Sequence, residues 1–129
     1  MSLETTTYNV YRVRFTQRGN PDHEGIALVP AQNSDQLAGR FYHVKGTVGM
    51  GMDYERKPGH RFGAIDGYKD STFQFQLPKS MLHRFEEIAA KHPPPYDPRV
   101  LTETKPDPPA RNCVNWVDDV LDEAKRELS

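Results

Sequence analysis

The chain has a single cysteine, Cys113, among 129 residues, and no long apolar segment. A single cysteine excludes an internal disulfide bond, which fits a reducing compartment. Residues 2–7 are mostly polar and do not resemble a secretory signal, and no apolar run reaches the length of a membrane-spanning helix. The sequence therefore predicts a cytoplasmic or nuclear protein without a stable membrane anchor.

An excess of charge is also absent, because the formal net charge is only −1. Proteins that bind nucleic acid or a membrane surface through basic residues carry a clustered positive charge. We therefore expect no nucleic acid among the partners. The length is typical of one domain that buries its own core.

Glycine does not occur after residue 70, and seven of the eleven prolines lie between Pro93 and Pro109. The part of the chain before residue 78 is therefore predicted to consist of strands and turns. Alternating or short apolar runs predict strands at 8–15, 25–29, 40–45, 61–66 and 71–77.

Apolar residues at helical spacing predict two helices, at 78–91 and 112–128. The Pro-rich residues 93–109 cannot pair in a sheet and are expected to form an extended connector. We therefore predict an α+β fold in which an antiparallel β-sheet packs against the two helices. Residues 1–7 are expected to be disordered, and residues 8–129 to form one domain.

Cys113 lies where the second predicted helix begins, directly after Asn112. Asn112 is a favourable N-cap residue, and the N–H groups of a first helical turn can stabilise a thiolate or a developing oxyanion. A thiolate is the nucleophilic form of cysteine. The alternative is that Cys113 is a small buried apolar residue, because it also lies near the apolar stripe of the helix.

Two histidines are the candidate partners of this thiol. His23 precedes the strand at 25–29 and shares its face with Gly25 and Ala27, while His43 lies within the strand at 40–45. A lone cysteine with histidines elsewhere in the chain is a candidate nucleophile–base pair. His23 would then be the base and His43 would orient it. Alternatively, His23 caps a turn and His43 bonds to a neighbouring strand.

The other candidate residues give weaker signals. Trp116, one helical turn after Cys113, would either exclude water from a substrate pocket or belong to the core. Cys113, His23 and His43 carry no spacing typical of a zinc site. We therefore expect neither a metal nor a cofactor. His60 lies in a segment rich in glycine, proline and arginine and is expected in a turn.

Three short motifs resemble those of the circularly permuted papain-like proteins, which include lecithin:retinol acyltransferase and relatives of the NlpC-type peptidases. The motifs are His23-Glu24-Gly25-Ile26-Ala27-Leu28-Val29, Phe41-Tyr42-His43-Val44 and Asn112-Cys113-Val114-Asn115-Trp116-Val117. The last is also similar to an Asn-Cys-x-x-Trp-Val element of small fungal proteins with the same order of elements.

This resemblance implies a cysteine hydrolase or acyltransferase that acts on an ester, amide or thioester. Cys113, His23 and His43 would form its catalytic site, Asn112 would support the oxyanion, and Trp116 and Glu24 would line the substrate pocket. The substrate would be an acyl or peptide-like compound. Glu24 departs from the family pattern, which has an aromatic residue after the base, and the Pro-rich connector is a second departure.

A non-catalytic protein-interaction domain of the same fold is the alternative function. Residues 93–109 would then form a surface for a protein partner. Within them, Pro93-Pro94-Pro95-Tyr96 resembles the Pro-Pro-x-Tyr sequences that small aromatic-lined domains recognise.

Overall fold

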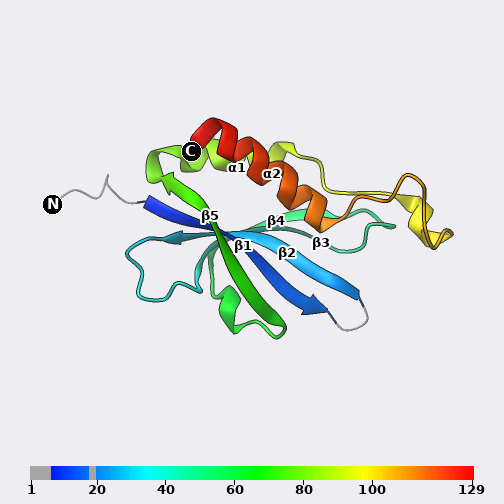
Figure 1. The fold of residues 1–129 in the computed structure, drawn as a ribbon, viewed down its shortest axis with the longest axis horizontal. Helices are drawn as coiled ribbons and strands as arrows, with labels where there is room; N and C mark the ends of the chain where they lie inside the picture. The colour runs from blue at the N-terminus through cyan, green and yellow to red at the C-terminus, as the bar shows by residue number, and fades with distance from the viewer. Residues whose placement is uncertain (1–6, 18–19) are drawn as a thin grey trace.

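A five-stranded antiparallel sheet forms the centre of the molecule (Figure 1). The computed structural model describes residues 7–17 and 20–129. The strands are β1 (Thr7–Gln17), β2 (Asn20–Pro30), β3 (Gly39–Lys45), β4 (Asp53–His60) and β5 (Tyr68–Pro78). Their order across the sheet is β4-β3-β2-β1-β5, so β4 and β5 are the two edge strands.

Two α-helices lie on one face of this sheet (Figure 1). They are α1 (Leu82–Lys91) and α2 (Cys113–Leu128). The described residues also form the short 3-10 helices η2 (Phe62–Ala64), η3 (Lys79–Met81) and η4 (Pro98–Leu101). An antiparallel sheet with two helices confirms the predicted α+β class.

The alternation of side chains along the strands divides the core into two layers. Beneath the helices, Val10, Ile26 and Leu28 of the sheet pack in one cluster with Trp116 and Leu121 of α2. The layer on the other face consists of Val13, Phe15, Ala27, Val29, Phe41 and Phe62. The sheet therefore separates two sets of buried side chains.

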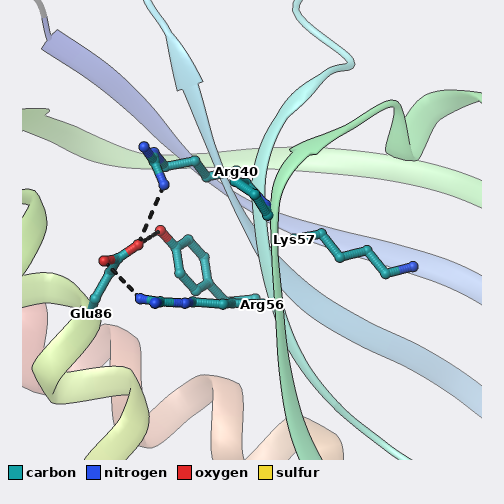
Figure 2. A pocket seen from close by; sticks show the side chains of 6 residues that line it. Arg40, Arg56, Lys57 and Glu86 are labelled. Carbon is teal, nitrogen blue, oxygen red and sulfur yellow. Dashed lines mark hydrogen bonds and ion pairs between the residues drawn. The ribbon is translucent and has the colours of Figure 1, made fainter.

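Glu86 connects α1 to the sheet beneath it (Figure 2). Its carboxylate accepts a hydrogen bond from Tyr42 Oη at 2.7 Å and another from Arg56 Nη1 at 2.9 Å. Arg40 Nη1 lies 3.6 Å from the same carboxylate, whereas Lys57 points away from it. Arg56 and Lys57 are neighbours on β4, so they project to opposite faces of the sheet.

Two predicted elements differ from the structure. The strand expected at 61–66 is wrong, because η2 occupies part of this segment and the fourth strand is β4. Pro58 and several charged residues hide the strand pattern of β4, but an edge strand tolerates both. The helix expected at 78–91 becomes α-helical only at Leu82, because Pro78 is the last residue of β5 and η3 follows it.

The expected disorder of residues 1–7 concerns mainly residues 1–6, which lie outside the described residues, and Thr7 already belongs to β1. Residues 93–109, called the proline strap from here on, form no strand, as predicted, but they are not extended throughout, because η4 and then a turn and bends at 102–108 interrupt them. The strap leaves α1, runs beyond the N-terminal end of α2 and returns to it (Figure 1). Among the described helices, none has both the length and the apolar character needed to cross a membrane.

Candidate functional site

The two predicted histidines meet on the face of the sheet opposite the helices. His23 Nε2 lies 2.9 Å from His43 Nδ1, and His43 Nε2 lies 2.7 Å from Glu55 Oε1. His23 is on β2, His43 on β3 and Glu55 on β4 directly opposite His43. Three adjacent strands therefore align two imidazoles and a carboxylate in one hydrogen-bonded series.

Gly25 of β2 makes this arrangement possible, because it has no side chain and leaves room for the side chains of Phe41 and His43 on β3. A Cβ atom at Gly25 would lie 2.5 Å from Phe41 Cζ and 3.2 Å from His43 Cβ. The Phe41 ring therefore occupies space that any other residue at position 25 would fill. Its centroid lies 4.9 Å from that of His43, so Phe41 supports the imidazole from one side.

The histidine pair lines a pocket of about 230 Å³, which we call the histidine pocket. Phe15 packs against His23 with a centroid distance of 5.9 Å, and Phe41 packs against His60 at 5.2 Å. The lining residues are Phe15, Thr16, Gln17, His23, Phe41, His43, Lys57, His60, Ile65 and Asp66. Apolar rings, three imidazoles, one lysine and one aspartate thus line a space suited to a small ligand.

Burial keeps the imidazoles uncharged at neutral pH. Burial, with a smaller effect of His43, lowers the pKa of His23 to about 4. The pKa of His43 is also lowered by burial, with smaller contributions from Lys57 and Lys45, although Glu55 opposes this shift. Hydrogen bonds from His43 and then from Lys45 lower the pKa of Glu55 to about 2. The series therefore combines a carboxylate with two neutral imidazoles.

These charge states fix the positions of the protons. Because Glu55 is ionised, it only accepts, so the neutral His43 carries its proton on Nε2 and donates it to Glu55. His43 Nδ1 is then an acceptor, and His23 must donate from Nε2 across the 2.9 Å contact. The lone pair of His23 consequently lies on Nδ1. Burial disfavours a charge on His23, but when His23 gains a proton this series lets the charge move toward Glu55.

The structure does not bring Cys113 to the histidines. Cys113 is 7% exposed and packs in the layer beneath the helices, whereas the histidine pocket lies on the other face. Burial raises the pKa of the Cys113 thiol, and this effect outweighs the N–H groups of Glu24 and Val114, which lower it. The expected contact between Cys113 and His23 is therefore wrong, and the thiol form is favoured over the thiolate.

Asn112 caps α2 as predicted. Its Oδ1 accepts a hydrogen bond from Val114 N–H at 2.9 Å, and its own N–H donates to Asn115 Oδ1 at 2.9 Å. Asn112 lies beside Cys113 and, like it, lies apart from the residues that line the histidine pocket.

Glu24 and Trp116, expected to line a substrate pocket, do not line the histidine pocket, although Glu24 follows His23 directly on β2. Glu24 is buried and accepts a hydrogen bond from Arg12 Nε at 2.5 Å, while Arg12 Nη2 donates to Asp118 of α2 at 2.7 Å. Trp116 is 2% exposed, and its Nε1 donates to the carbonyl of His92 at 3.1 Å. Trp116 contributes to a groove along the proline strap, and Glu24 on β2 is linked to α2 through Arg12 of β1.

Sequence reasoning missed Glu55 and Lys57 and expected His60 in a turn, because residues 53–60 were not expected to form a strand. A signal was present in the glycine-rich turn at 46–52, which predicts a hairpin. Folding this hairpin about its centre places Glu55 opposite His43, as observed.

Within residues 7–17 and 20–129, no three His, Cys, Asp or Glu side chains are arranged to hold a metal ion.

Comparison with known proteins identifies a family but no activity. No curated protein matches the chain, and no solved structure matches it. A model of a family of unknown function, DUF6540, matches residues 10–127, which include every residue of the histidine pocket, the proline strap, α1 and all of α2 but its last residue. The chain belongs to this family of unknown function.

Proposed function

We propose that the protein hydrolyses an ester, amide or thioester, or transfers its acyl group, with His23 as the general base. The series Glu55–His43–His23 at the wall of the histidine pocket carries this proposal. Ionisable residues with shifted pKa values in a pocket are typical of catalytic sites. A histidine aligned by a second polar group is the usual form of a general base.

In the proposed reaction, His23 Nδ1 takes a proton from a water molecule or from another acceptor with an O–H or N–H group. The resulting nucleophile adds to the carbonyl carbon of the substrate. As His23 gains this proton, its Nε2 proton moves toward His43, so the positive charge lies nearer to Glu55. The tetrahedral intermediate then expels the leaving group, which takes the proton from His23 Nδ1, and the initial state is restored.

The proposal gives Cys113 no chemical step, since the sheet separates it from His23 and burial raises its pKa. An acyl-enzyme on sulfur, which the resemblance to papain-like proteins implied, would need the two side chains on the same face. The resemblance would then apply to the order of the elements rather than to the nucleophile.

The experiment compares hydrolysis of p-nitrophenyl acetate and of a simple acyl thioester by the wild type and by single variants. We expect His23→Gln to lower kcat/KM by about 100-fold or more, as is typical when a general base is lost. Glu55→Gln should lower it less and should alter its pH dependence. Cys113→Ser and His83→Gln serve as matched controls, because the His83 side chain is 87% exposed on α1.

The pH dependence provides an independent test. Because His23 acts as the neutral form and its pKa is about 4, kcat/KM should rise around that pH and level off above it. A midpoint near the ordinary imidazole value of about 6.5 would contradict the assignment of His23. Full activity of His23→Gln, or loss of activity in Cys113→Ser, would overturn the proposal.

A further inference from the structure

The proline strap begins with Pro93-Pro94-Pro95-Tyr96, and hydrogen bonds to the folded domain fix the backbone of this run. Trp116 Nε1 donates to the carbonyl of His92 at 3.1 Å, just before the run. Met52 N–H donates to the carbonyl of Pro95 at 2.9 Å. Asp97 N–H donates to the carbonyl of Val48 at 2.9 Å, just after the run. The segment is thus held at both ends.

The side chains of this run divide into a buried side and an exposed side. Pro95 is buried and Pro94 is half-buried, whereas Pro93 is exposed and Tyr96 is 65% exposed. Consecutive prolines favour the polyproline II helix, which has about three residues per turn. Residues 93 and 96 therefore project in the same direction, away from the side that Pro95 anchors.

Tyr96 is held in position although most of its ring is open to solvent. A Cβ atom at Gly51 would lie 3.5 Å from Tyr96 Cδ1, so the edge of the ring rests on the loop between β3 and β4. The adjacent Asp97 forms an ion pair with Arg99, in which Arg99 Nη2 lies 2.6 Å from Asp97 Oδ2. A large, oriented and exposed aromatic side chain is well suited to fill a pocket on a partner.

We propose that Pro93 and Tyr96 form a ligand for a WW-type domain, a small protein domain that binds polyproline II segments in an aromatic-lined groove. Such a groove contacts one side of the polyproline II helix, and Pro93 and Tyr96, three residues apart, are the exposed side chains on one side of this run. Because the run is already ordered, binding would cost less conformational entropy than binding of a free peptide. The inference does not depend on the chemistry of the histidine pocket.

The same geometry argues against an SH3-type domain as the partner, because SH3 domains bind a Pro-x-x-Pro sequence. The only such pair that includes a residue of this run is Pro95 and Pro98. Pro95 is buried against the domain, so the pair cannot be bound as a unit. An SH3 domain therefore serves as a control partner.

The experiment titrates the full chain with a purified WW domain of the class that binds Pro-Pro-x-Tyr peptides, by calorimetry. We expect Pro93→Ala and Tyr96→Ala each to weaken binding by about tenfold or more, equivalent to about 1.4 kcal/mol. Leu101→Ala is the matched control, since Leu101 is an apolar side chain of the same strap and is 60% exposed. Binding of this variant should stay within about twofold of the wild type.

A synthetic peptide of residues 90–99 distinguishes the folded ligand from the bare sequence. Binding of both the peptide and the chain, with loss in the two motif variants, supports the proposal. Binding of the peptide but not of the chain would mean that the fold hides the motif and would overturn it. Equal weakening by Leu101→Ala, or binding of the SH3 domain with similar affinity, would also overturn it, because the contact would then be unspecific.

Discussion

Cys113 shows how the environment of a single residue can cancel a favourable local position. The sequence correctly places it at the start of a helix capped by Asn112. The first turn of a helix lowers the pKa of a thiol, but transfer out of water raises it, and here burial is the larger effect. Sequence spacing gives the position in the helix but not the extent of burial.

Alkylation of Cys113 tests this balance. Because the pKa of its thiol is raised and the side chain is 7% exposed, we expect iodoacetamide to modify Cys113 more slowly than free cysteine near neutral pH. The rate is measured by mass spectrometry of the native protein, with the denatured protein as the control. Modification faster than that of free cysteine would indicate an activated thiolate.

Trp116 and His23 should differ in their contributions to stability. Trp116→Ala removes a large buried ring and is expected to lower the free energy of unfolding by about 3–5 kcal/mol. His23→Ala removes a hydrogen bond and should lower it by about 1 kcal/mol. Denaturation curves of the two variants provide the comparison. An equal loss in both would identify His23 as a structural residue.

At the scale of elements, the sequence predicts best where one residue pattern determines the structure. The apolar stripe and N-cap of α2 and the alternation of β1 are of this kind, and both elements are confirmed. β4 was not predicted, because it contains Pro58 and several charged residues. An edge strand tolerates these residues, but the position of a strand at the edge depends on the assembled sheet.

The sequence predicts only some of the residues that meet at the candidate site, for a related reason. Alternation shows that His23 shares a face with Gly25 and Ala27. It does not show which face the helices cover, because β2 is apolar on both sides. The sequence therefore placed Cys113 beside His23, whereas the structure places the sheet between them. Lys57 and Glu55 lay outside any predicted strand.

The N-cap of α2 gives a prediction at the same scale. Asn112→Ala removes the acceptor for Val114 N–H and is expected to lower the free energy of unfolding by about 1 kcal/mol. Asn112→Asp keeps an acceptor at the cap and should retain most of the stability. Thermal melts of both variants measure the difference. An equal loss in the two would show that the Asn112 side chain acts by other contacts.

For the whole molecule, the buried histidines predict a stability that falls in acid. Unfolded His23 titrates near pH 6.5 and folded His23 at about 4. Between these values the unfolded chain binds more protons, so the free energy of unfolding decreases as the pH falls. Allowing for screening by solvent, this amounts to about 1–2 kcal/mol for His23.

Urea denaturation near pH 7 and near pH 4.5 measures this effect. The wild type should lose more stability between the two values than His23→Gln, which has no imidazole to protonate. His83→Gln, on the exposed face of α1, should behave as the wild type does. The same acid-induced loss in the wild type and in His23→Gln would contradict the shifted pKa.

The sheet also determines whether the two proposed binding sites influence each other. The histidine pocket lies on one of its faces, and the proline strap is attached through Trp116 to the layer on the other. The hydrogen bonds of the strap to Val48 and Met52, in the turn between β3 and β4, involve no residue that lines the pocket. No described side chain belongs to both buried layers. We therefore expect a coupling free energy near zero, so that a ligand in the histidine pocket changes the affinity for a WW domain by less than about twofold. The chain would then behave as two thermodynamically independent receptors on one cooperative fold, and either could be removed by mutation while the other is retained.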